Sequence, residues 1–175
     1  PAGIGKSWVL SAMGAYAISK GLNVVHYTLE LNEAYVGLRY DSIFSGVESQ
    51  NLKYHKDEVI ERLDKLEGNL TIKYYPTKAC TVNTLSAHLK KVTTFGTKVD
   101  MVLVDYADIM KDVNKHTEMR HALGSIYEDI RGLAGEMQIP IWTASQANRS
   151  ALDEDVIEAS KVAESYAKVM TADFV

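Results

Sequence analysis

The first seven residues of the chain, PAGIGKS, constrain its fold more than any other stretch. With one glycine placed before them, they complete the phosphate-binding loop G-x-x-x-x-G-K-[ST], which joins a β-strand to the start of a helix. Glycines let the backbone N–H groups of such a loop turn toward a triphosphate, because no Cβ stands in the way. A helix expected at residues 8–20 would place the partial positive charge of its N-terminus beneath the phosphates. The chain is therefore expected to fold as an α/β domain.

The polar residues of this loop have predicted roles. Lys6 is expected to contact the β- and γ-phosphates, and the Ser7 hydroxyl is expected to bind Mg²⁺. A Gly-rich turn that merely precedes a helix is the alternative interpretation. Because the loop needs a strand in front of it, we expect the sequence to be a fragment of a longer protein. The predicted nucleotide-binding residues are Pro1, Ala2, Gly3, Ile4, Gly5, Lys6, Ser7 and Trp8.

The composition excludes several classes of protein. The 175 residues, 46% of them hydrophobic and 24% charged, suit one globular α/β domain covering residues 1–175. A net charge of −4 gives no global basic field, so any contact with nucleic acid would be local or supplied by a ring of subunits. A single cysteine, Cys80, excludes an internal disulfide and a cysteine zinc site. No apolar run approaches the length of a membrane span and no signal peptide is visible, so a cytosolic protein without a membrane partner is predicted.

Hydrophobic patterns along the chain predict strands that alternate with helices. This order is typical of a mostly parallel sheet flanked by helices, with right-handed crossovers and with its first and last strands incomplete in this chain. Asn32 and Thr81 are predicted N-caps, Gly21 is a predicted C-cap, and residues 107–116 are predicted to form a loop. The helical face at residues 51–67 is predicted to carry Val59, Ile60, Leu63 and Leu66. Strands are predicted at residues 22–29, 70–75, 99–106 and 139–145, with another beginning at 172–175; helices are predicted at 8–20, 31–44, 51–67, 81–94, 117–137 and 161–170.

Polar residues at four places end a predicted strand or follow one directly: Lys6 with Ser7, Glu30, Asp105 and Gln146. Ligands of open parallel sheets bind beyond the carboxyl ends of the strands, so these residues are expected to converge there. Asp105 closes the apolar run MVLVD, the Walker B pattern, and is predicted to hold Mg²⁺; its alternative is an aspartate that opens a surface turn. Glu30 is predicted to deprotonate the attacking water, with a carboxylate that stabilises a helix start as the alternative.

Gln146 and Arg39 complete the predicted site. The amide of Gln146 is suited to sensing the γ-phosphate, although a polar residue at a strand end is the simpler interpretation. Arg39 is expected to reach a phosphate or a neighbouring subunit, and a solvated helix charge is at least as good an interpretation. His26 lies inside a predicted strand and is expected to be a buried core histidine.

Four stretches resemble the ATPase domain of the DnaB family of replicative helicases, a RecA-like P-loop NTPase fold, and the resemblance covers almost the whole chain. The phosphate loop is one of them. The others are TLELNEAYVGLR (28–39), LVDYADIM (103–110) and SQANRS (145–150), and the last is the most discriminating. The final AESYAKVMTADFV (163–175) is similar to a further family segment, and the spelling of the motifs suggests a phage-type member.

The resemblance implies a motor that hydrolyses ATP or another nucleoside triphosphate, with Mg²⁺, at the subunit interfaces of a hexameric ring. Such a motor translocates on single-stranded DNA with 5′-to-3′ polarity and unwinds duplex, with primase and a helicase loader as partners. It would act in the cytoplasm, that of the host if the protein is phage-encoded. By position, the resemblance makes Glu30, Lys6 and Gln146 catalytic and gives DNA contacts to Lys111, Lys115, Lys161 and Glu164.

Two departures from the family pattern concern the DNA contact and the trans-acting arginine. Ala163 stands where the family usually has an arginine that touches DNA, which puts that contact in doubt. The arginine finger of the family lies beyond the last strand and is expected outside this chain.

The main alternative is a RecA-type recombinase or a signalling ATPase of the same fold. Such proteins share the residues that correspond to Lys6, Glu30 and Asp105, whereas the stretch SQANRS favours the helicase. A binding module without catalysis is a third class, and Glu30 and Gln146 argue against it. A nucleoside kinase also uses a phosphate loop, but it is not expected to carry SQANR.

Overall fold

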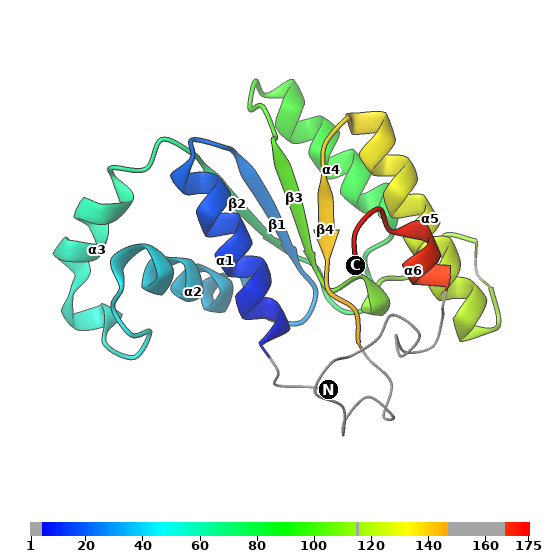
Figure 1. The fold of residues 1–175 in the computed structure, drawn as a ribbon, viewed down its shortest axis with the longest axis horizontal. Helices are drawn as coiled ribbons and strands as arrows, with labels where there is room; N and C mark the ends of the chain where they lie inside the picture. Colours follow the sequence, from blue (N-terminus) through cyan, green and yellow to red (C-terminus); the bar gives the residue numbers. More distant parts are fainter. Residues whose placement is uncertain (1–4, 115, 147–166) are drawn as a thin grey trace.

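The described chain is built on a four-stranded sheet in which every neighbouring pair is parallel (Figure 1). The computed structural model describes residues 5–114, 116–146 and 167–175. Because all pairs are parallel, the carboxyl ends of the strands lie at one edge of the sheet, as predicted from the alternation of strands and helices. The strand order is β2–β1–β3–β4, with β1 at Val24–Thr28, β2 at Leu70–Tyr74, β3 at Met101–Asp105 and β4 at Ile141–Thr143.

Helices connect the strands and lie close to most of the predicted ranges. The first described helix begins at Lys6, inside the phosphate-loop motif, and the longest described helix joins β3 to β4. A short 3-10 turn, η2 at Ala107–Ile109, follows β3 inside the stretch predicted as a loop. The other elements are α1 at Lys6–Ser19, α2 at Glu33–Ser45, η1 at Leu52–Tyr54, α3 at Lys56–Leu63, α4 at Val82–Thr94, α5 at Met119–Met137 and α6 at Ala167–Thr171.

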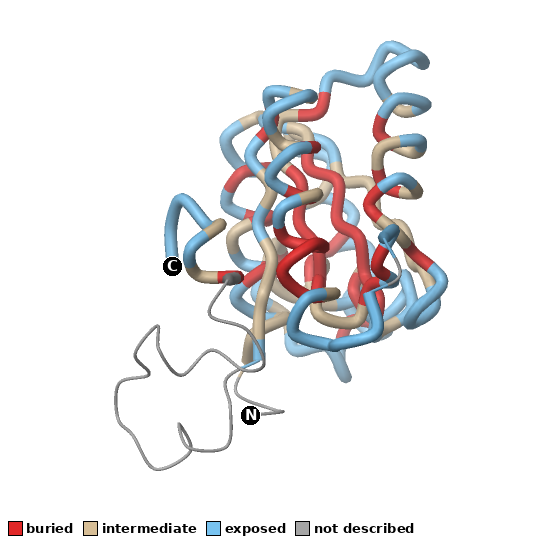
Figure 2. Tube along the Cα trace, turned by 90° about the vertical axis from the view of Figure 1, so that its right-hand side faces the viewer, coloured by how far each residue is buried: buried red, intermediate tan, exposed pale blue. Residues whose placement is uncertain are grey.

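Two hydrophobic cores cover the two faces of the sheet, and Figure 2 shows the strands buried between the helical layers. Helices α4 and α5 pack on one face through residues such as Leu85 and Ile126, against Val102 and Val104 of β3. Helices α1 and α2 pack on the other face through Ile18 and other residues, against Leu103. This alternation follows from the two-residue period of a strand and directs successive side chains to opposite faces.

Local signals in the sequence predicted several helix boundaries correctly. The Asn32 side chain accepts a hydrogen bond from the Tyr35 N–H at 3.0 Å and caps α2. Thr81 and Thr84 form a reciprocal capping box at the start of α4. Gly21 follows α1 with φ of +79°, a conformation that favours glycine because it has no Cβ.

The prediction of one helix over residues 51–67 is wrong. The segment forms η1 and then α3, which ends at Leu63, and Ile60 is 55% exposed. Only Val59 of α3 is buried, because α3 packs beside α2 at the margin of the sheet. The chain must then return past α1, where Gly68 lies so close to the Ile18 backbone that a Cβ would clash.

The strand predicted at residues 172–175 is also absent. These residues form no strand, and Phe174 instead stacks on Trp142 with ring centroids 6.5 Å apart. The Ala172 N–H still bonds to the Lys168 carbonyl, and Asp173 pairs with Arg131 at 2.8 Å, so the chain bends after α6 and does not form a strand. Only the end of the helix predicted at 161–170 falls within the described residues, as α6.

Candidate nucleotide site

The phosphate loop enters α1 through a glycine with positive φ. Gly5 has φ of +91° and is the N-cap of α1, and its carbonyl accepts the Val9 N–H at 2.9 Å. Lys6 begins the helix, with its Nζ 5.8 Å from the centre of the Tyr106 ring. Lys6, in the described part of the loop, thus lies near the residue that follows β3, as expected for a phosphate loop. The predicted nucleotide-binding residues Pro1, Ala2, Gly3 and Ile4 lie outside the described residues.

Asp105 is buried at the end of β3, on the side of the sheet that α1 covers. It is 1% exposed, and neither carboxylate oxygen has a hydrogen-bond partner. Burial raises its pKa, while the nearby Ser7 hydroxyl, Arg39 and Lys6 act in the opposite direction and Glu30 raises it further. The Ser7 hydroxyl and the charges of Arg39, Lys6 and Glu30 thus all act on Asp105.

The environment of Asp105 fits a hard divalent cation. A buried carboxylate without hydrogen bonds beside a serine hydroxyl supplies the oxygen ligands that Mg²⁺ prefers. Mg²⁺ characteristically takes one or two protein ligands and completes its shell with substrate phosphates and water. Across the described ranges, no cluster of three or more His, Cys, Asp or Glu side chains forms an alternative metal site. Ser7 and Asp105 are therefore the residues that would hold Mg²⁺.

Glu30 lies beside this site and remains exposed to solvent. It follows the end of β1, where the Leu29 N–H donates to the Asp105 carbonyl at 2.8 Å and extends the pairing of β1 with β3. The charge of Glu30 contributes to the raised pKa of Asp105 and of Tyr106. Glu33, the next glutamate along the chain, instead accepts the Tyr74 N–H at 2.9 Å at the edge of β2. Of these two glutamates, Glu30 is the one whose charge acts on Asp105 and Tyr106.

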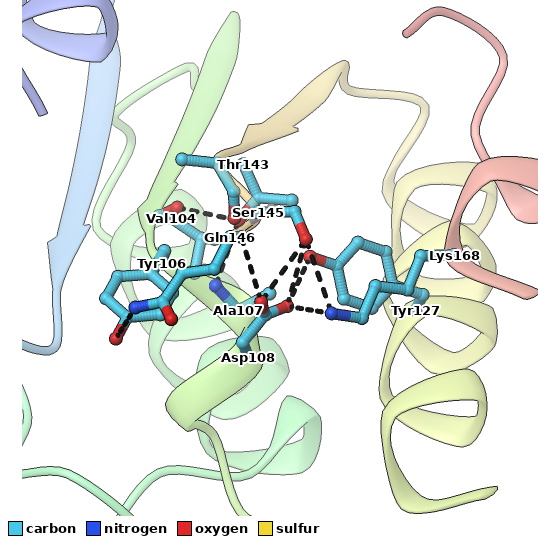
Figure 3. Close-up of polar contacts among 10 residues, drawn as sticks. Val104, Tyr106, Ala107, Asp108, Tyr127, Thr143, Ser145, Gln146 and Lys168 are labelled. Atoms are coloured by element: carbon cyan, nitrogen blue, oxygen red, sulfur yellow. Dashed lines mark hydrogen bonds and ion pairs between the residues drawn. The ribbon is translucent and has the colours of Figure 1, made fainter. Parts of the chain in front are cut away.

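Gln146 is held over the carboxyl edge by the segment that follows β3. Its side-chain Nε2 donates to the Tyr106 hydroxyl at 2.8 Å, and its backbone N–H donates to Asp108 Oδ2 at 3.2 Å (Figure 3). Thr143 fixes the ends of β3 and β4 together, because its hydroxyl donates to the Val104 carbonyl and accepts the Ala107 N–H. Tyr106 therefore contacts both residues: its hydroxyl accepts from Gln146, and its ring lies near the Lys6 ammonium.

Arg39 reaches the site from α2 and stacks on Trp8. Its guanidinium carbon lies 5.4 Å from the centre of the Trp8 ring, and its Nη1 is buried without a hydrogen-bond partner. Its charge lowers the pKa of both Asp105 and His26, which a cation directed into solvent would not do. Trp8 is 46% exposed and borders a shallow groove with Leu31, Tyr35 and Leu38. A phosphate or subunit contact for Arg39 stays a prediction.

Beneath the site, His26 pairs with a tyrosine of α2. His26 Nδ1 lies 2.8 Å from the Tyr40 hydroxyl, and both side chains are buried. Burial lowers the pKa of His26 to about 4, and the charge of Arg39 acts in the same direction, so the ring is neutral near pH 7. The prediction of a buried core histidine is confirmed.

Most residues predicted to contact DNA are not described by the structure. Lys115, Lys161 and Glu164 lie outside the described residues. Lys111 is exposed directly after η2, and its N–H is anchored by the Cys80 carbonyl at 2.8 Å. The predicted contact for Lys111 remains a prediction.

Sequence reasoning missed the polar residues that support Gln146. Tyr106, Asp108, Ser145 and Lys168 form a hydrogen-bonded group with it, yet none was singled out as a site residue. A signal was present at Asp108, an acidic residue placed between apolar neighbours directly after a strand. Lys168 gave no signal, because its partner is distant in sequence.

Comparison with known proteins places these motifs in one family. The family model of the DnaB-like helicase C-terminal domain matches residues 1–173. The DnaB-like replicative helicase of enterobacteria phage T4 is 28% identical over 98% of this chain and 38% of its own length. The replicative DNA helicase DnaB of Helicobacter pylori strain J99 is 25% identical over 87% of this chain and 32% of its own length. The chain therefore spans about a third of these relatives.

Solved structures show the same fold. A structure described as that of a DnaB-like replicative helicase and its interactions with primase matches 98% of this chain and 43% of its own, with a TM-score of 0.81 and 16% identity. A second structure, described as an ATPase domain, matches 93% of this chain and 62% of its own, with a TM-score of 0.76 and 15% identity. The predicted RecA-like fold is thereby confirmed. No helix within the described ranges is long and apolar enough to cross a membrane.

Proposed function

Because the chain belongs to the family of DnaB-like helicase C-terminal domains, we propose that it is the ATP-hydrolysing motor of a replicative DNA helicase. One observation supports this most strongly. The buried carboxylate of Asp105 ends β3 at the carboxyl edge of the sheet, and Lys6, Ser7 and Glu30 all act on its pKa. Since the chain spans about a third of its curated relatives, unwinding is proposed for the intact protein.

The chain's own residues divide the work of binding the nucleotide. The N–H groups around Gly5 and the Lys6 ammonium would hold the β- and γ-phosphates, and Ser7 and Asp105 would hold Mg²⁺. Bound Mg²⁺ neutralises the charge that develops on the transferred phosphoryl group. Trp8 and Arg39 border the outer side of the same site, where Arg39 would add a positive charge.

Glu30 is the proposed general base. Its exposed position next to the buried Asp105 lets water reach it, and its carboxylate would accept the proton of the water that attacks the γ-phosphate. Gln146 would contact the γ-phosphate through its amide, which the Tyr106 hydroxyl already orients. Loss of the γ-phosphate would then change the contacts of the chain that follows β4.

The assembly and the partners are proposed from the family. A homo-hexamer would place the nucleotide between neighbouring subunits, and the converging lysines, including Lys111, would bind one DNA strand despite the acidic chain. We extend the proposal to 5′-to-3′ polarity, a helicase loader and primase. The similar structure that records a DnaB-like helicase with its primase interactions supports the last of these.

The experiment that tests the proposal measures ATP hydrolysis by the intact protein with and without single-stranded DNA. Glu30→Gln is expected to lower kcat by roughly a hundredfold or more, the range for a lost general base, while nucleotide binding is retained. Glu33→Gln is the matched control. Because the Glu33 carboxylate accepts a hydrogen bond from Tyr74 of β2, this substitution should leave kcat unchanged. ATP hydrolysis that survives Glu30→Gln would refute the assignment of the base.

Unwinding of a forked duplex separates the helicase from a RecA-like recombinase. The proposal expects ATP-dependent strand separation that Glu30→Gln abolishes. DNA-stimulated hydrolysis accompanied by filament formation and strand pairing, without unwinding, would favour the recombinase instead.

A further inference from the structure

Asp108 joins three parts of the chain through one carboxylate. Its Oδ1 accepts the Tyr127 hydroxyl of α5 at 2.7 Å and pairs with Lys168 Nζ of α6 at 3.0 Å. Its Oδ2 accepts the Ser145 hydroxyl and the Gln146 N–H, both at 3.2 Å (Figure 3). Both oxygens are thus acceptors for groups on elements that are separate in sequence.

This ion pair is buried, so its geometry is tightly defined. The Asp108 side chain is 12% exposed and that of Lys168 is 2% exposed. Lys168 Nζ also donates to the Ser145 hydroxyl at 3.3 Å and lies 5.6 Å from the centre of the Tyr127 ring. A buried charge pair is stable only when further hydrogen bonds complete it, and here they do. Helices α5 and α6 therefore fix the carboxylate in place.

Gln146 is held at two points, and both holders follow β3 directly. Tyr106 holds its side-chain amide and Asp108 holds its backbone N–H. Because Asp105 ends β3 immediately before them, the position of Gln146 is set relative to the residue proposed to hold Mg²⁺.

From this geometry we propose that Asp108 is a positioning residue for γ-phosphate recognition. Its carboxylate holds the Gln146 backbone so that the amide meets the γ-phosphate, which makes the protein prefer ATP over ADP. The inference rests on the proposed function, since it needs Gln146 to contact the nucleotide. It goes beyond that function because it assigns the preference for ATP over ADP to the Asp108 carboxylate, which lies outside the phosphate site.

The essential property of Asp108 is the acceptor that it presents to the Gln146 N–H. A backbone N–H cannot rotate away, so an acceptor must lie on that side. Asparagine retains a carbonyl oxygen that can face Gln146, and its amide group can then donate to the Tyr127 hydroxyl. Asparagine next to the Lys168 ammonium would turn the other way, with the oxygen toward the cation. Removing the charge of Lys168 therefore makes asparagine a valid replacement, whereas alanine supplies no acceptor.

The test compares variants of the intact protein that all carry Lys168→Met, so that no unpaired ammonium is buried. Titrations with Mg²⁺ present give the Kd for ADP and for the non-hydrolysable β,γ-imido analogue of ATP. Lys168→Met alone and Lys168→Met with Asp108→Asn should prefer the ATP analogue over ADP to a similar extent, because both present an acceptor to the Gln146 N–H. Lys168→Met with Asp108→Ala should lower that preference about tenfold, the size expected for losing a hydrogen bond to a fixed group. Thermal unfolding of each variant verifies that it is folded.

Gln146→Ala completes the experiment as a reference. It should reduce the preference at least as much as Asp108→Ala, and adding Asp108→Ala to it should change the preference no further. An unchanged preference after Asp108→Ala, or equal losses for alanine and asparagine at position 108, would overturn the inference while the ATPase activity stands. If Gln146→Ala has no effect, the sensor role and this inference both fail. A wild-type protein that binds neither nucleotide would contradict the proposed function itself.

Discussion

Replacing Gly14 by alanine is expected to destabilise the domain, although Gly14 lies in the interior of a helix. Glycine normally weakens a helix, so alanine would improve the intrinsic stability of α1. However, a Cβ at this position would overlap the Tyr40 hydroxyl and lie 2.8 Å from Leu103 Cδ1. The Tyr40 hydroxyl is held in the core by His26, so it cannot move without breaking that hydrogen bond.

The size of the effect follows from three contributions. Overpacking of a core costs about 1–3 kcal/mol, and leaving a buried group such as His26 Nδ1 without its partner costs about 1–3 kcal/mol. The helix propensity of alanine offsets at most about 1 kcal/mol. The free energy of unfolding should therefore fall by about 2–4 kcal/mol in Gly14→Ala.

Urea unfolding measures this change, and two further variants make the test specific. Gly132→Ala in α5 is the matched control, because its added Cβ would meet no atom within 4 Å apart from the neighbouring backbone of the helix itself. This variant should be more stable than the wild type by about 0.5–1 kcal/mol. Tyr40→Phe removes the overlapping hydroxyl, so Gly14→Ala should cost less in that background than in the wild type. A Gly14→Ala protein as stable as the Gly132→Ala control would refute the reasoning.

Two other predictions concern buried ionisable groups. His26 has its pKa lowered to about 4, so the unfolded chain binds its proton first and stability should fall by about 3 kcal/mol between pH 6.5 and 4. His88, whose pKa burial also lowers, adds a smaller loss, and His26→Gln should remove most of the dependence seen in urea unfolding at several pH values. Asp105→Asn removes a buried carboxylate that has no hydrogen-bond partner, so ATP hydrolysis should be abolished while the free energy of unfolding stays equal or rises by about 1 kcal/mol. A marked loss of stability in Asp105→Asn would show that its charge is already compensated in the fold.

The candidate site was accessible to sequence reasoning because its residues occupy strand ends. Asp105 ends an apolar strand, and Glu30 and Gln146 follow one. Parallel strands bring such positions to one edge of the sheet whatever the helices do. Lys6 and Ser7 were accessible for a similar reason, since the phosphate loop and its helix are contiguous in sequence.

The parts that sequence reasoning missed depend on contacts between distant elements. Nothing near Lys168 in the sequence shows that its ammonium meets Asp108, because the partners lie on α6 and after β3. The same limit explains the wrong helix at residues 51–67, where the hydrophobic period is real but the sheet offers no surface for Ile60. Periodicity predicts which residues share a face, and only tertiary packing decides whether that face is covered.

The strand order has a consequence for where sequence change is tolerated. After β1 the chain turns to α2 on one face of the sheet, and after β3 it turns to α5 on the opposite face (Figure 1). Because these two connections leave the adjacent strands β1 and β3 toward opposite faces, a topological switch point lies between the strands, with Glu30 and Asp105 on either side of it. The segment with η1 and α3 belongs to the connection that runs outward to β2, away from that opening. Insertions or deletions in residues 46–65, which exclude the close contact of Gly68 with α1, should therefore change the outline of the domain while leaving the separation of the two carboxylates intact.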